Sequence, residues 1–318
     1  MNMFTDTEGR LRPAWAFVLS VLLAGFSFFL CSYFASSIAG DHILRFEAIF
    51  RTCLAGLLLA GFAWLLAVGN HVEEHRFAAQ GLPLQQGWLR QLAAGCGLGF
   101  VLLVIAVVAV ALFGRLTFHA TLTSHNLLRI PIVLLVLATG SLAEELMFRG
   151  YPFQRLVEAI GSGGAILIFS MLFGFVHWMN PGANPWGLLN TVLIGVVLSV
   201  AYLRTRALWL PWGLHFAWNT TLGLVFGLPV SGIRMFNVFV HTTAVGPEWL
   251  TGGTYGLEAS LPGASVVLIG LIVVWRFPLR RLTDPAAFFP SRHDPAPDPA
   301  PHPPNVNTPP HPPAELGL

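Results

Sequence analysis

Polar residues occur at three places in the apolar middle of the chain, and their side chains could carry out acid–base chemistry. The first pair is Glu144 with Glu145, the second place holds His177, and the third holds His215 with Asn219 four residues later. Ionisable groups inside membrane helices are costly and usually face a cavity or a partner. We therefore expect one chemical site, built from Glu144, His177, His215 and Asn219.

Helical geometry gives the two adjacent glutamates different surroundings. At about 100° per residue, Arg149 lies about 40° around the helix axis from Glu145 but about 140° from Glu144. Glu145 can therefore pair with Arg149 on one face and support the site, which offsets the cost of burying both charges. Glu144 faces away from Arg149, without a partner on its own helix, and is the carboxylate that we expect to act as general base.

The spacing along the chain also predicts the depth of these residues. The helix that carries Glu144 is expected to continue to Ile160, turn at the glycine-rich residues 161–164, and be followed by an antiparallel helix. Glu144 lies about 17 residues before the middle of this turn and His177 about 15 after it, so a rise of about 1.5 Å per residue brings both to similar heights. His215 and Asn219 share one helix face and are expected beside them, toward the cytoplasmic half.

Composition indicates that the elements carrying these residues lie in lipid. Hydrophobic residues make up 55% of the 318 residues and charged residues only 10%, whereas soluble proteins are about a quarter charged. We predict an all-α, polytopic integral membrane protein of about eight transmembrane helices, because a helix of roughly 17–25 apolar residues crosses the hydrocarbon core. The predicted apolar runs are 14–38, 48–69, 89–113, 130–148, 164–178, 188–203, 207–227 and 262–277.

Charge and proline content then divide the chain. Most arginines fall in segments on one side of the predicted helices, which favours a cell-membrane protein with both termini in the cytoplasm. Residues 1–282 form the expected membrane domain, with the polar clusters in its core at 128–222. Residues 283–318 hold about half of the 23 prolines and are expected to form a disordered cytoplasmic tail. The arginines expected on the outer side are Arg45, Arg51, Arg115, Arg129 and Arg234.

The three motifs together resemble one known family. E-E-x-x-x-R, F-x-x-x-H and H-x-x-x-N occur here in order, on separate predicted helices, without substitution. This pattern resembles the CPBP family of intramembrane endopeptidases, which includes the type II CAAX prenyl endopeptidases and the abortive-infection relatives. The resemblance implies a glutamate-dependent peptidase. Glu144, helped by His177, would activate water, and His215 with Asn219 would stabilise the oxyanion, while Glu145 and Arg149 hold the site together.

Metal dependence and other functions stay open from the sequence. Glu144, His177 and His215 could form a His₂Glu zinc set, but the oxyanion role available to His215 favours a metal-free site. The segment His71–His75 reads H-x-x-E-H, an inverted zinc-protease pattern, but it lies in a polar connection between helices. The expected partners are membrane lipid and a peptide or protein substrate, lipidated or not, and no nucleic acid. The alternatives are a membrane transporter or channel, or a non-catalytic immunity or scaffold protein, that uses the same polar residues.

Overall fold

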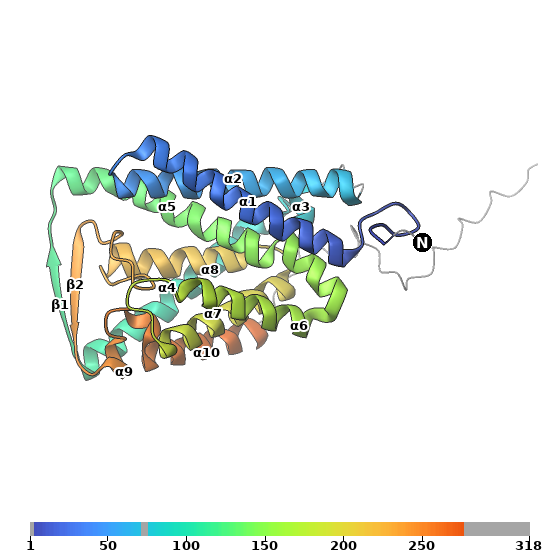
Figure 1. The fold of residues 1–318 in the computed structure, drawn as a ribbon. Coiled ribbons are helices and arrows are strands. Elements are labelled where there is room, and N and C mark those ends of the chain that lie inside the picture. The colour runs from blue at the N-terminus through green and yellow to red at the C-terminus, as the bar shows by residue number, and fades with distance from the viewer. Residues whose placement is uncertain (1–2, 71–75, 277–318) are drawn as a thin grey trace, which may run out of the picture.

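A computed structural model of the protein describes residues 3–70 and 76–276. These residues form a mostly helical bundle with a small two-stranded sheet across one end (Figure 1). In chain order the helices and strands are α1 (Pro13–Ala39), α2 (Ile43–Asn70), α3 (Arg76–Ala79), α4 (Trp88–Phe113), β1 (Arg115–Ala120), α5 (Ser124–Arg149), α6 (Tyr151–His177), α7 (Pro185–Thr205), α8 (Trp209–Thr220), the π-helical turn η1 (Thr221–Val225), β2 (Val240–Val245), α9 (Glu248–Thr251), the 3₁₀ turn η2 (Leu257–Ala259) and α10 (Leu261–Arg276).

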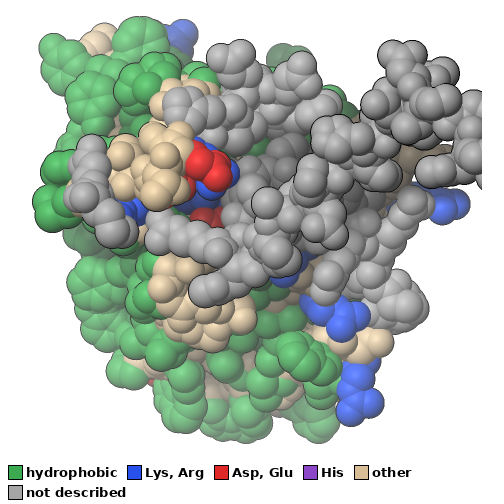
Figure 2. Space-filling model, turned by 90° about the vertical axis from the view of Figure 1, so that its right-hand side faces the viewer, with side chains coloured by type: hydrophobic (Ala, Val, Ile, Leu, Met, Phe, Trp, Pro, Cys, Tyr) green, Lys and Arg blue, Asp and Glu red, His purple; other side chains and the backbone are tan. Residues whose placement is uncertain are grey.

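Five helical stretches of the described residues are long and apolar enough to cross a membrane. They are α1, α2, α4, the stretch Ser124–His177 that comprises α5 and α6, and α7. A shorter apolar helix is α10. Their outer faces expose large hydrophobic side chains such as Phe29, which is 75% exposed. Hydrophobic side chains also cover much of the face in Figure 2 that is not drawn in grey. The fold is consistent with a polytopic membrane protein. Each predicted apolar run falls on a helix as far as the chain is described, and the number of eight crossings stays a prediction.

The boundary between α5 and α6 differs from the sequence prediction. We expected one helix to continue through Arg149 to Ile160, but α5 ends at Arg149 and Gly150 leaves the helical conformation. The reason is Pro152, which has no N–H to donate to the carbonyl of Phe148 four positions earlier and whose ring would clash with that carbonyl in a continuous helix. The predicted turn at the glycine-rich segment is confirmed, because Gly161 has φ 84° and bends α6.

Small residues bring α4 and α8 into backbone contact. A Cβ atom added to Gly99 of α4 would lie 2.5 Å from the Leu214 carbonyl oxygen of α8. A Cβ atom on Gly95 or on Gly213 would collide in the same way with the backbone of the opposite helix. Small residues at such positions let membrane helices approach closely. This contact fixes the position of α8, which carries His215 and Asn219.

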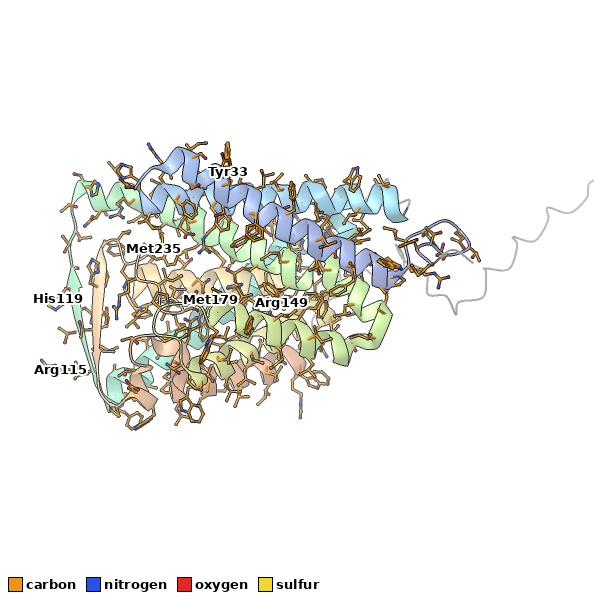
Figure 3. The ribbon with its side chains drawn as sticks, viewed as in Figure 1. Tyr33, Arg115, His119, Arg149, Met179 and Met235 are labelled. Carbon is orange, nitrogen blue, oxygen red and sulfur yellow. The ribbon has the colours of Figure 1, made fainter. Side chains whose placement is uncertain are left out.

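The two-stranded sheet was not predicted. β1 pairs with β2 in antiparallel register, from Arg115 opposite Val245 to Ala120 opposite Val240. The all-α prediction is therefore wrong in this detail, although the protein is mostly helical. The strands are six residues each and more than a hundred residues apart in the chain, so no local sequence pattern predicts their pairing. His119 and Arg115 mark β1 at the left of the bundle in Figure 3. The same view shows Arg149 in the middle of the bundle.

Candidate active site

Glu145 and Arg149 form a fully buried ion pair on one face of α5. Arg149 Nη1 lies 3.3 Å from Glu145 Oε1, and both side chains are 0% exposed. Arg149 also donates from Nη2 to the carbonyl of Gly195 at 3.1 Å, and from Nε to Ser199 Oγ at 3.5 Å. Its guanidinium lies 4.5 Å from the centre of the Phe173 ring. One arginine thus joins α5 to α6 and α7, and these contacts stabilise it in a buried position.

Glu145 also orients the first histidine of the site. His215 Nδ1–H donates to Glu145 Oε1 at 2.8 Å, and the His215 side chain is only 7% exposed. A carboxylate can only accept, so this hydrogen bond places the proton of the neutral ring on Nδ1 and leaves the lone pair on Nε2. Nε2 then points at the second glutamate, 3.7 Å from Glu144 Oε2.

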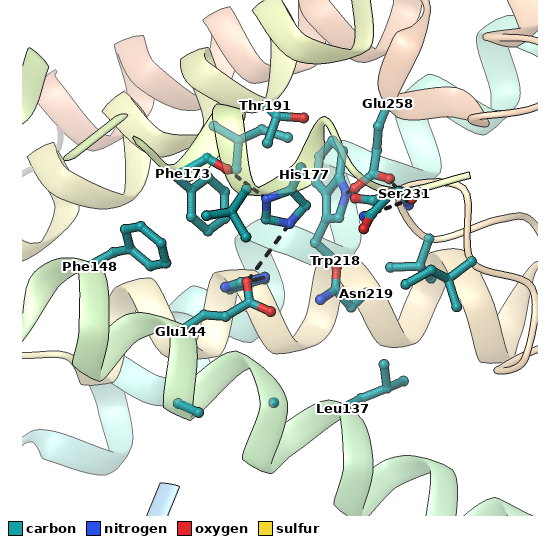
Figure 4. Close-up of a pocket in the computed structure, with 18 of the residues that line it drawn as sticks. Leu137, Glu144, Phe148, Phe173, His177, Thr191, Trp218, Asn219, Ser231 and Glu258 are labelled. Carbon is teal, nitrogen blue, oxygen red and sulfur yellow. Dashed lines mark hydrogen bonds and ion pairs between the residues drawn. The ribbon is translucent and has the colours of Figure 1, made fainter. Parts of the chain in front are cut away.

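The second histidine is held in the same tautomer by a different group. His177 Nδ1–H donates to the carbonyl of Phe173, one turn earlier in α6, at 2.7 Å. Its Nε2 lies 4.0 Å from Glu144 Oε2, and the two side chains face one another in Figure 4. The predicted common depth of Glu144 and His177 is confirmed by this distance, although the predicted continuous helix from Glu144 to Ile160 is not.

Three acceptor atoms therefore converge at Glu144. The two Nε2 atoms carry lone pairs when the rings are neutral, and Glu144 Oε2 is buried without a hydrogen bond from any described residue. Acceptors do not stabilise one another, so this arrangement suits a small donor placed between them. A water molecule can donate to two acceptors at once and keep a lone pair for attack.

Arg51 of α2 is a site residue that the sequence argument missed. Its Nη1 lies 3.8 Å from Glu144 Oε1, and its Nε lies 2.5 Å from Glu47 Oε2. Glu144 therefore has a cationic neighbour, which the sequence of its own helix did not predict. Gly140 makes the approach possible, because a Cβ there would lie 2.8 Å from Arg51 Cδ and closer still to Nη1. Only a contact between two distant helices reveals this residue, and the arginine count had assigned it to an outer segment.

These groups line one cavity of about 260 Å³. Asn219 lies on its wall, one turn beyond His215 on α8, so all four predicted reactive residues share the cavity (Figure 4). Most of the remaining wall is apolar, including Leu137 and Phe148. Another polar region, unpredicted, comes from Thr191, Ser231 and Glu258 and from the indole of Trp218.

Glu144, His177 and His215 are also the residues that would hold a metal ion if the protein bound one here. Histidine ligands commonly donate their other ring nitrogen to a carboxylate or carbonyl, as both do here. No group of three or more His, Cys, Asp or Glu side chains within the described residues has the geometry of a metal site. The preference for a metal-free site stays a prediction. The rival segment His71–His75 lies outside the described residues, as does the proline-rich tail.

Comparison with known proteins places this site in a family. Residues 125–221 match the type II CAAX prenyl endopeptidase Rce1-like family, and this part of the chain is a domain of that family. All six predicted site residues lie in the matched region, whereas Arg51 and Glu258 lie outside it.

One bacterial protein is similar to part of this chain. The protein named "Putative membrane peptidase YdiL", from Bacillus subtilis (strain 168), is 33% identical over 92 residues. The match covers 29% of this chain and 36% of the relative, so the chain spans about a third of that relative's length. No solved structure matches the chain.

Proposed function

We propose that the protein is an intramembrane endopeptidase in which Glu144 is the general base. The observation that carries this proposal is the convergence of Glu144 Oε2 with the Nε2 atoms of His177 and His215, at 4.0 and 3.7 Å, inside a largely apolar cavity. A carboxylate and an imidazole that reach one water molecule can remove its proton as it attacks a carbonyl carbon. Membership of its middle part in an endopeptidase family supports the same reaction.

The residues divide the reaction between them. Glu144, helped by His177, takes a proton from water while the oxygen bonds to the carbonyl carbon of the peptide. His215 and Asn219, one turn apart on α8, stabilise the negative oxygen of the tetrahedral intermediate, where removal of one such donor typically costs about 10²–10³ in kcat. When the C–N bond breaks, the proton held by Glu144 passes to the leaving nitrogen and gives a neutral amine.

In the neutral ring described above Nε2 of His215 is an acceptor, so His215 can donate to the oxyanion only after this nitrogen has also taken up a proton. The buried Glu145 carboxylate, 2.8 Å from Nδ1, favours that doubly protonated ring. Arg149 in turn lies 3.3 Å from Glu145 Oε1 and balances the charge of this buried carboxylate. Glu145 and Arg149 are therefore positioning residues that act through His215.

The substrate and the orientation belong to this proposal too. The family name points to peptides cleaved near a prenylated cysteine, and the relative's name points only to a peptidase in a membrane. An apolar cavity within helices that face lipid suits a peptide that reaches the site from the bilayer. We propose a cell-membrane protein with both termini in the cytoplasm.

Cleavage of a peptide library by the purified protein in detergent tests the function. We expect Glu144→Gln to remain folded and lose cleavage, because it removes the base and keeps the side-chain volume. Glu248→Gln, which changes an exposed carboxylate of α9, is the matched control. Full activity of Glu144→Gln would overturn the mechanism. The same assay after extensive chelation separates the two forms of the site: activity lost and then restored by zinc would make Glu144, His177 and His215 metal ligands.

A further inference from the structure

Glu258 is a second buried carboxylate on the cavity wall, and the proposed reaction does not use it. Its side chain belongs to η2, just before α10, and the residue is 4% exposed. Oε1 accepts a hydrogen bond from Trp218 Nε1 at 3.1 Å, and Oε2 accepts one from the backbone N–H of Ser231. Figure 4 shows these groups together, on the far side of His177 from Glu144.

The chain around Glu258 is built to hold it in this position. Asn190 of α7 donates from Nδ2 to the carbonyls of Glu258 at 2.9 Å and Ser260 at 3.1 Å. The preceding loop depends on glycines in the left-handed region, with φ 76° at Gly252 and 101° at Gly256. A Cβ atom on Gly252 would collide with the Gly256 carbonyl oxygen. This backbone conformation is unfavourable for other residues, and ordering these glycines costs conformational entropy. The loop course that they allow places the Glu258 carboxylate at the cavity.

This carboxylate forms no ion pair with any residue that the structure describes, although His177 is near enough to interact with it electrostatically. Both of its hydrogen-bond donors are neutral, and no described arginine or histidine lies within ion-pair distance of it. Arg51, which also lines the cavity, is engaged with Glu47 and Glu144. Burial is the largest effect on Glu258 and raises the pKa of its carboxyl, while the hydrogen bonds from Ser231 and Trp218 and the nearby His177 act in the opposite direction. Buried charges are normally paired, so a cation that enters this cavity gains a partner there.

We propose that Glu258 is a specificity-determining residue that binds a cationic group of the peptide substrate. The group is a lysine or arginine side chain, or a free amino terminus, of the peptide that Glu144 would cleave. This inference rests on the proposed function for the identity of the ligand as a peptide. It concerns a residue that the family match does not include, because Glu258 lies outside residues 125–221.

Peptide binding, measured separately from cleavage, tests the inference. Apolar peptides would be prepared in matched forms, with lysine or acetyl-lysine at one position and with a free or acetylated amino terminus. Dissociation constants would be measured for the full-length protein in detergent. We expect the wild type to bind one cationic form at least roughly tenfold more tightly than its acetylated match, since pairing with a desolvated charge is worth a kcal/mol or more. The two sets of peptides distinguish a side chain from an amino terminus.

Variants then assign the preference to Glu258. In Glu258→Gln the ratio of the two dissociation constants should fall to near one, whereas Glu248→Gln should keep the wild-type ratio. Equal affinity of the wild type for charged and acetylated forms would overturn the inference, even if Glu258→Gln did not fold. A preference retained in folded Glu258→Gln would overturn it as well. Selective binding without cleavage of any peptide would instead refute the proposed function and leave the charge selectivity in place.

Discussion

The buried pair of Glu145 and Arg149 allows a quantitative prediction about stability. Glu145→Gln leaves the Arg149 guanidinium at 0% exposure, with a carbonyl and a hydroxyl but no carboxylate. Removing one partner of a buried ion pair costs about 3–5 kcal/mol, because the other charge stays desolvated. At about 2–4 °C per kcal/mol for a protein of this size, the Tm should fall by roughly 6–20 °C. Thermal unfolding in detergent measures the change.

A double-mutant cycle separates this charge effect from general damage to the core. Arg149→Met should also be strongly destabilising, but Glu145→Gln with Arg149→Met should recover part of the loss, with a coupling free energy of about 1–3 kcal/mol. Glu8→Gln is the control, since Glu8 pairs with Arg10 at 2.8 Å while its side chain is 65% exposed, and it should change stability by less than about 1 kcal/mol. If Glu145→Gln were no more destabilising than Glu8→Gln, the reasoning about the buried pair would be refuted.

Two further predictions concern the approach of Arg51 and the orientation of the bundle. Gly140→Ala should displace Arg51 from Glu144 and lower kcat more than Gly97→Ala on α4, where an added Cβ meets nothing within 4 Å, and equal kcat in the two variants would contradict this. A reporter fused after Pro285 should behave as cytoplasmic and one inserted near Thr251 as external, and the opposite result at both positions would reverse the proposed topology.

Local periodicity was sufficient for the helices and for the polar residues that lie on them. The apolar runs located every long helix, and the angle between Glu144 and Glu145 on one helix correctly assigned the Arg149 pair to Glu145. The i, i+4 spacing of His215 and Asn219 likewise predicted that both lie on the same side of one helix, and both line the cavity. These inferences succeed because they depend only on residues within a few turns of one another. Their catalytic roles stay predictions, because geometry alone does not measure a reaction.

The residues that the sequence did not reveal reach the site through long-range contacts. Arg51 comes from α2, almost a hundred residues before Glu144, and reaches it only past Gly140. Glu258 comes from a loop whose course depends on glycine conformations and on Asn190. The sequence signal for Glu258 is its position as an acidic residue two positions after Gly256, in a glycine-rich segment between apolar runs. The break at Gly150 had a local cause in Pro152, and that signal was present in the sequence.

The contact between α4 and α8 has a mechanical consequence for the site. α4 contributes no charged or polar side chain to the cavity. The absence of side chains at Gly95 and Gly99 nevertheless sets the distance between α4 and α8. A single methyl group at this contact would push α8 away from α4 by a distance comparable to the ~1 Å misplacement that can cost an enzyme about 10²-fold in rate. The tolerance of the reaction to substitution is therefore decided partly by the clearance between two apolar helices, on the side of α8 that never meets the substrate.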